Sequence, residues 1–143
     1  MQQGISRISA LLFVAALIAC GGSDNGTQPL ALAGAYTATE FVTTNSSGQT
    51  NQLTAGSTLT ITLNSNGSTT GHLHIAASGG DPAFDADMAG TWTQSGMTVN
   101  FSQSADTFVR NMPFTAVAQG PNWSLVGNGT FSGTSIHITL TRS

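Results

Sequence analysis

The stretch Thr58-Leu-Thr-Ile-Thr-Leu-Asn64, continued by Ser65-Asn66-Gly67 and by Gly71-His-Leu-His-Ile-Ala-Ala77, decides the fold. Leucine and isoleucine alternate with threonine in the first segment and with histidine in the last, which is typical of strands with one buried face. Asn66 and Gly67 accept positive φ angles, so Ser65-Asn66-Gly67 suits a tight turn between the two alternating segments. The stretch therefore predicts a β-hairpin.

The same alternation continues through the rest of the chain, and no helical period is evident after residue 30. It predicts eight strands, over residues 34–43, 58–64, 71–77, 86–93, 97–102, 107–118, 122–131 and 135–142. Eight consecutive strands with short links predict an all-β, antiparallel, up-and-down eight-stranded barrel, because closure removes unpaired edges. A two-sheet β-sandwich is the alternative architecture.

The N-terminus has a different character. Residues 1–9 carry one charge, Arg7, and residues 10–19 form an unbroken apolar run. A membrane-spanning helix needs roughly 20 apolar residues, so this shorter run favours a signal peptide. The run ends in Leu17-Ile18-Ala19-Cys20, which resembles the lipobox of bacterial lipoproteins. The resemblance implies cleavage before Cys20, diacylglycerol on its sulfur and acylation of the freed amine. An ordinary secretory signal with a chance cysteine, or a buried core helix, is the alternative.

These features predict three segments: a signal peptide over residues 1–19, a lipidated cysteine with a flexible tether over 20–31, and a barrel domain over 32–143. At about 3.3 Å per residue, the linker 21–29 reaches at most roughly 30 Å, so the domain stays near the membrane. We expect a lipid-anchored protein of the bacterial cell envelope. Gly21 after the cysteine, where an Asp would otherwise signal retention, implies the outer membrane in a Gram-negative host. Cys20 is the single cysteine, so no disulfide is available.

Charge is sparse in this chain. It contains no lysine, three arginines and six acidic residues, for a net charge of −3. So few cations cannot neutralise a run of phosphates, which makes nucleic acid a poor partner. The expected partners are the membrane, through the lipid on Cys20, and a small hydrophobic ligand. The sequence identifies no protein partner.

A short pattern, Gly-x-aromatic-Thr/Ser, occurs at Gly34-Ala35-Tyr36-Thr37, Gly90-Thr91-Trp92-Thr93 and Gly129-Thr130-Phe131-Ser132. With it, residues 32–142 resemble the lipocalin-like group of small bacterial β-barrels. The resemblance implies that Gly34 and Tyr36 open the first strand and that Arg142, near the end of the last strand, packs across the aromatic ring. Tyrosine stands here in place of the tryptophan of lipocalins. The resemblance also implies a barrel whose open end binds a small, often apolar molecule.

Two polar residues stand out among the expected inward-facing side chains. In a regular strand, Arg110 shares a face with Phe108, Met112 and Phe114, and Glu40 shares one with Tyr36. A buried cation needs a partner, so either Glu40 pairs with Arg110 or Arg110 anchors an anionic ligand. Alternatively, a bulge at Pro113 turns Arg110 to solvent.

The candidate ligand-binding residues are therefore the inward-facing aromatic and charged side chains. They are Tyr36, Glu40, Trp92, Phe101, Phe108, Arg110, Phe114 and Trp123. The same aromatic side chains also suit a barrel filled by its own core, which would make the protein a structural or interaction lipoprotein. Both interpretations remain open at this point.

Other chemistry is weakly indicated. His72-x-His74 has a spacing that zinc sites use, but exposed histidines on a polar strand face are the simpler interpretation. Asp81, Asp85 and Asp87 gather in one connection without the ligand pattern of a calcium loop, which favours a solvated acidic loop. There is no Gly-x-Ser-x-Gly elbow and no paired carboxylate cleft. We expect no metal, no cofactor and no enzymatic activity.

Overall fold

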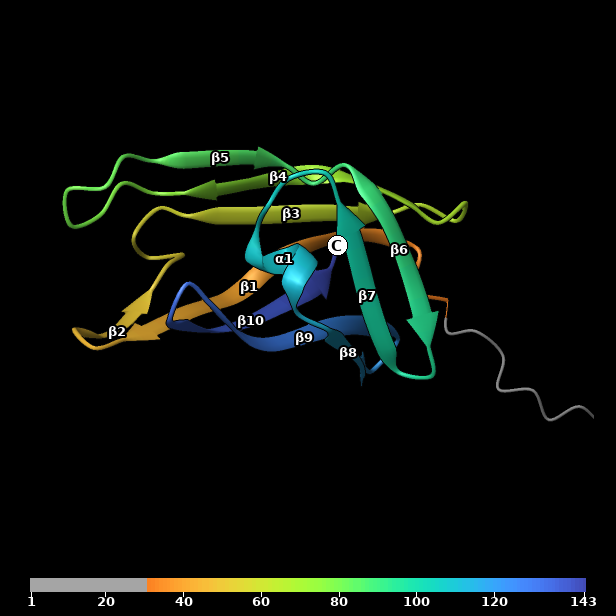
Figure 1. Cartoon of the computed structure of the whole chain (residues 1–143). Helices are drawn as coiled ribbons and strands as arrows, with labels where there is room; N and C mark the ends of the chain where they lie inside the picture. The colour runs from red at the N-terminus through yellow and green to blue at the C-terminus, as the bar shows by residue number, and fades with distance from the viewer. Residues whose placement is uncertain (1–30) are drawn as a thin grey trace, which may run out of the picture.

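The computed structural model describes residues 31–143. The predicted signal peptide, Cys20 and nearly all of the tether fall within residues 1–30 and lie outside this range. The described residues form ten strands and one short helix (Figure 1). The elements are β1 (Gly34–Asn45), β2 (Gly48–Asn51), β3 (Thr58–Leu63), β4 (Ser68–Ile75), β5 (Phe84–Asp87), β6 (Gly90–Ser95), β7 (Thr98–Gln103), α1 (Phe108–Asn111), β8 (Phe114–Gln119), β9 (Asn122–Phe131) and β10 (Thr134–Arg142).

Eight of the strands close into an antiparallel barrel. The order around the ring is β1-β3-β4-β6-β7-β8-β9-β10, and β10 pairs again with β1. The other two strands lie beside the ring: β2 pairs with β1, and β5 pairs with β4. The predicted up-and-down eight-stranded barrel is confirmed, and the sandwich alternative is wrong.

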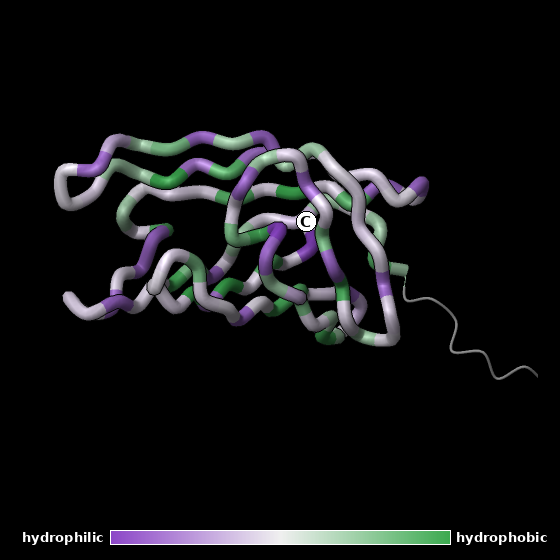
Figure 2. The backbone as a smooth tube through the Cα atoms, viewed as in Figure 1, coloured by the Kyte–Doolittle hydropathy of each residue, from purple (hydrophilic) through white to green (hydrophobic). Residues whose placement is uncertain are grey.

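The predicted hairpin forms from β3 and β4, as its sequence indicates. Leu59, Ile61 and Leu63 are at most 1% exposed, while the intervening threonines lie on the outer face. At the turn, the Gly67 amide donates to the Asn64 carbonyl over 3.0 Å, and Gly67 has a φ of 84°. Figure 2 shows hydrophobic and hydrophilic residues alternating along several strands of the barrel. The hydrophobic pattern thus fixes the register of this hairpin.

The chain ends meet where the barrel closes. The Arg142 guanidinium donates to the backbone carbonyls of Ala31 over 3.0 Å and of Ala33 over 2.6 Å. The Tyr36 hydroxyl donates to the Leu32 carbonyl over 2.8 Å. A Cβ atom at Gly34 would lie 2.5 Å from Arg142 Nε, so only glycine leaves room for the guanidinium. Gly34, Tyr36 and Arg142 therefore lie together where β1 and β10 close the ring, with Tyr36 opposite Arg142 in the register.

One predicted strand is partly helical. Residues 107–118 were expected to form a continuous strand, but α1 and β8 occupy this segment. Phe108, Val109 and Met112 are all buried, which fits a helical turn and not alternation. Pro113 restricts the residue before it to extended conformations, and Met112 has φ −133° and ψ 144°, so the helix ends there.

The predicted strand 86–93 is also divided. β4 changes partner along its length: Ser68 and Thr69 pair with β6, whereas His72 to Ile75 pair with β5. The chain between β5 and β6 bends around Met88, which is fully buried. β5 and β6 keep one register along β4, but only β6 pairs with a further strand on its second side.

A β-bulge in β1 reverses the expected placement of Glu40. The pairing with β10 shifts between Ala38 and Glu40, so Phe41 takes the next inward position after Ala38. The prediction that Glu40 faces inward with Tyr36 is wrong, because one extra residue moves every following side chain to the other face.

The interior of the barrel is filled by side chains. The largest fully buried ones come from six strands of the ring and from the segments before β1 and between β5 and β6, as expected for a narrow eight-stranded barrel. They are Tyr36, Phe41, Phe114, Leu32, Leu59, Ile61, Leu63, Leu73, Met88, Leu125, Ile138 and Leu140. All eight strands of the ring and the pairing of β10 with β1 that closes it lie within residues 31–143.

We predict that Gly71→Ala strongly destabilises the barrel. Gly71 has a φ of 143°, and a Cβ atom there would collide with the Thr60 carbonyl oxygen on β3. We expect a loss of about 2 kcal/mol or more in the free energy of unfolding, measured by urea titration. The control is Gly79→Ala, at φ 61° with no atom within 4 Å, which is expected to cost only about 1 kcal/mol. Equal losses in the two variants would contradict the close-approach argument.

Candidate functional site

Most of the aromatic residues predicted to line a ligand site belong to the filled core. Tyr36, Phe101 and Phe114 are 1%, 6% and 0% exposed. The rings of Phe101 and Phe114 pack edge to face with centroids 5.2 Å apart. Trp92 and Trp123 are partly buried against the same core, and the Trp92 indole donates to the Asn64 carbonyl over 2.9 Å. Of these predicted wall residues, Phe108 is the one that borders the apolar pocket described next.

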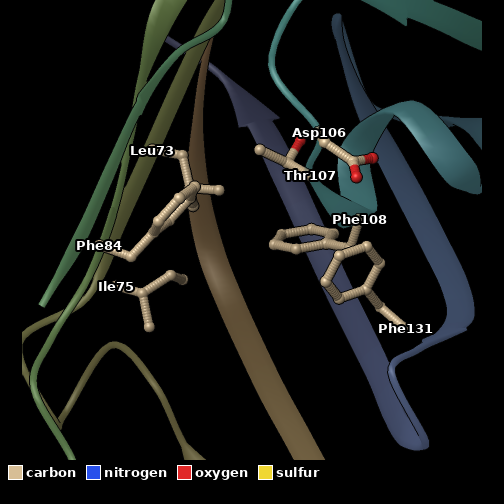
Figure 3. Close-up of a pocket in the computed structure, with 7 residues that line it drawn as sticks. All are labelled: Leu73, Ile75, Phe84, Asp106, Thr107, Phe108 and Phe131. Carbon is tan, nitrogen blue, oxygen red and sulfur yellow. The ribbon is translucent and has the colours of Figure 1, made fainter. Parts of the chain in front are cut away.

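This pocket has a volume of about 210 Å³ and is partly open to solvent. Figure 3 shows Leu73, Ile75 and Phe84 on one side of it, and Phe108 and Phe131 on the other. The first three come from β4 and β5, Phe108 comes from α1, and Phe131 ends β9. The lining residues are Leu73, Ile75, Phe84, Asp106, Thr107, Phe108 and Phe131.

The pocket exists because the wall of the barrel is incomplete there. β5 pairs with β4 but with no further strand of the described chain, and β7 pairs with β8 only at Thr98 and Val99. α1 packs against β7 and β9 beside this opening. β5 stands on the opposite side and carries Phe84, which is 47% exposed, one of two large apolar side chains in the described chain with such exposure. Phe84 thus gives the pocket an exposed apolar edge.

The pocket has one polar end. Thr107 is 2% exposed, and its hydroxyl oxygen has no hydrogen-bond partner among the described residues. Asp106, the neighbouring lining residue, is exposed, and its carboxylate lies 3.4 Å from Arg110 Nη2. Asp106 precedes α1 and Arg110 lies within it, and both side chains are exposed to solvent. The inward placement of Arg110 is therefore wrong, and Arg110 faces solvent as the alternative expected, although it does so from a helical turn and not from a bulged strand.

Glu40 and Arg110 do not meet. The Glu40 carboxylate Oε2 lies 3.2 Å from His137 Nε2 and accepts a hydrogen bond of 3.2 Å from the Thr139 hydroxyl. These contacts lie on the outside of the barrel, where His137 also borders a shallow polar groove of about 410 Å³. The hypothesis of an inward Glu40–Arg110 pair is therefore wrong, and neither residue lines the apolar pocket.

The two neighbouring histidines meet two of the acidic residues. His72 Nε2 and His74 Nδ1 lie 2.9 Å and 2.8 Å from Asp85 Oδ1, and His72 Nδ1 lies 3.6 Å from Asp87 Oδ1. The β4–β5 register places His72 opposite Asp87 and His74 opposite Asp85. We call these four residues the outer His–Asp cluster, because their side chains alternate with the apolar residues that face the pocket.

Sequence reasoning found the members of the outer His–Asp cluster but not their contact. The sequence indicates two alternating segments, which became β4 and β5, joined by one connection. The length of that connection does not determine which residues of β4 lie opposite which residues of β5. Within residues 31–143, no group of three or more His, Cys, Asp or Glu side chains is arranged to hold a metal ion. Likewise, no helix in this range is long and apolar enough to cross a membrane.

Within the cluster, His72 and Asp85 shift each other's pKa. The hydrogen bond to Asp85 is the largest influence on His72 and raises the pKa of its imidazole. The hydrogen bonds from His74 and His72 lower the pKa of the Asp85 carboxyl. The contribution of His72 to stability is present below its unfolded pKa and is lost as pH rises through its folded pKa. The contribution of Asp85 is present above its unfolded pKa and is lost as pH falls through its folded pKa. The cluster is thus most favourable at mildly acidic pH.

We predict that Asp85→Asn returns the pKa of His72 toward its ordinary value. The carboxylate is the main cause of the raised pKa, and the amide keeps the shape without the charge. The measurement is an NMR pH titration of the His72 ring protons. Asp81→Asn, in the same β4–β5 connection but without a contact to His72, is the matched control. An unchanged His72 titration in the Asp85 variant would show that the contact does not persist in solution.

The comparisons with known proteins assign no family. No protein-family model matches the chain, and neither a curated protein nor a solved structure matches it. The functional conclusion therefore depends on the barrel, the pocket and the N-terminal motif.

Proposed function

We propose that this protein is a lipid-anchored lipoprotein of the bacterial envelope whose lipocalin-like barrel binds a small apolar or amphipathic ligand. The observation that carries the proposal is the apolar pocket between β5 and α1, with Phe84 half exposed at its edge. This is a binding function without a catalytic step.

The lining and size of the pocket indicate the chemistry of the ligand. Five of its lining residues are apolar: Leu73, Ile75, Phe84, Phe108 and Phe131. A cavity of about 150 Å³ with Leu, Ile and Phe walls is large enough to bind benzene. At about 210 Å³, this pocket accommodates one ring or a branched alkyl group. A larger ligand would extend through the opening toward Asp106, which suits an amphipathic molecule.

The location is supported by the sequence. Leu17-Ile18-Ala19-Cys20 resembles a lipobox, and several acyl chains on Cys20 would anchor the protein stably. The short tether would hold the barrel close to the bilayer, where apolar molecules partition. In a Gram-negative host, Gly21 after the cysteine favours the outer membrane.

The filled interior favours a second candidate function, a structural or interaction lipoprotein. Tyr36, Phe114 and Leu125 occupy the space that a deep lipocalin cavity would need. Under this alternative, the pocket beside α1 is a packing irregularity that binds no ligand. A ligand experiment separates the two candidates.

We predict that residues 31–143 bind the neutral fluorescent probe N-phenyl-1-naphthylamine, with its phenyl ring in the pocket and its naphthyl group at the opening, and that Phe84→Ala weakens this binding about tenfold. Loss of one partly buried aromatic wall costs about 1–2 kcal/mol of binding free energy. Fluorescence titration measures the dissociation constants. Met97→Ala is the matched control, because Met97 is 51% exposed but does not line the pocket.

Native mass spectrometry of the same fragment, expressed in a bacterial periplasm, would identify a natural ligand as a retained mass that Phe84→Ala loses. Two results would contradict the proposal: no probe binding by the unmodified fragment, or equal weakening by the Phe84 and Met97 substitutions. Either would favour the structural alternative.

A further inference from the structure

β5 has a free edge beside the pocket. It pairs with β4 on one side, and no other strand of residues 31–143 pairs with its second side. The Met88 amide donates to the Gly71 carbonyl over 3.0 Å, which marks these two residues as a hydrogen-bonded pair. In an antiparallel ladder such pairs recur at every second residue, so Phe84 and Ala86 bond to β4. The backbone N–H and C=O groups of Asp85 and Asp87 therefore point to the free edge.

The same four residues of β5 present two different faces. Phe84 and Ala86 lie opposite Ile75 and Leu73, on the side of the pocket. Asp85 and Asp87 lie on the outer side with side chains 54% and 87% exposed. A strand added to this edge would therefore direct alternate side chains into the pocket and toward the two carboxylates.

From these observations we infer that the apolar group held in the pocket is a side chain of an extended polypeptide segment, which adds as a strand to the free edge of β5. This inference rests on the proposed function, since it requires the pocket to hold an apolar group. In strand addition, main-chain hydrogen bonds supply affinity and pockets for alternate side chains supply specificity. Here the free edge of β5 offers the main-chain groups, and the apolar pocket offers a side-chain site. A free small molecule would use the pocket and leave the edge groups of Asp85 and Asp87 unused.

Charge defines the partner further. Residues of the added strand opposite Asp85 and Asp87 share the outer face with these carboxylates, so lysine or arginine is favoured there. The residue between them, opposite Ala86, points into the pocket and is apolar. The recognised pattern is thus basic-apolar-basic. A second copy of the same edge is disfavoured, because it would bring four carboxylates together.

The test uses residues 31–143 and the capped peptide Ser-Lys-Leu-Lys-Leu-Lys-Ser, labelled for fluorescence anisotropy. We expect it to bind and to displace N-phenyl-1-naphthylamine. The isomer Ser-Leu-Leu-Lys-Lys-Lys-Ser has the same charge without the alternation, and we expect at least about tenfold weaker binding from it. Methylation of the lysine backbone nitrogens removes the donors that face β5 and is expected to weaken binding by a similar factor.

Two substitutions at Asp87 separate the backbone edge from the charge. Asp87→Pro removes an N–H that points to the free edge, so it blocks strand addition without breaking a β4–β5 hydrogen bond. Asp87→Ala removes the same charge but keeps the N–H. We expect peptide binding about tenfold weaker for the proline variant than for the alanine variant, with unchanged probe binding by both. Circular dichroism and a thermal melt check that both variants stay folded.

The outcomes distinguish the two proposals. Equal affinity for the alternating peptide, its isomer and its N-methylated form would overturn strand addition, and so would equal peptide binding by the two Asp87 variants. If strand addition fails in either way but the probe still binds, the small-ligand proposal stands. If neither the probe nor any peptide binds, both proposals fail.

Discussion

The pairing of β10 with β1 is the interaction on which the rest of the structure depends. It runs from Tyr36 opposite Arg142 to Thr44 opposite Ser135 and converts an open meander into a closed ring. Arg142 strengthens it by binding the carbonyls of Ala31 and Ala33, at the entrance of the chain into β1. Without this pairing, two long strand edges would be exposed and the inward apolar residues would have no common interior.

Closure also determines where a ligand can bind. Because a narrow ring of eight strands is filled by its own side chains, large residues such as Tyr36 and Phe114 leave no space at the centre. Free space remains where the ring is irregular, between the unpaired edge of β5 and the segment where β7 separates from β8. The candidate site is thus a consequence of incomplete strand pairing in the wall of the barrel.

The barrel could be predicted from the sequence because its signal is local. The alternation of Leu59, Ile61 and Leu63 with threonine already identifies a strand, a face and a neighbouring turn. The helix α1 could not be separated from a strand in this way, since Phe108, Met112 and Phe114 also fit alternation. Pro113 was noted as an irregularity, but its effect depends on how the segment packs against the barrel.

The candidate site could be predicted only in part, because its geometry depends on pairings between distant segments. The bulge that turns Glu40 outward exists only in the register between β1 and β10. The contacts of His72 and His74 with Asp85 depend on the register across the connection between β4 and β5. Phe108, one of the candidates from the sequence, lines the pocket, whereas Phe84 lies next to aspartates in a segment whose sequence indicates an acidic loop.

The chemistry of β5 explains why an apolar pocket can persist at an exposed edge. A strand with a free edge and an exposed phenylalanine would ordinarily promote association between copies of the protein. Asp85 and Asp87 oppose this, because two such edges would repel each other, while the imidazoles of His72 and His74 hold Asp85 beside β4. The outer face of β5 therefore protects the edge against self-association and leaves its apolar face available to a partner of the opposite charge.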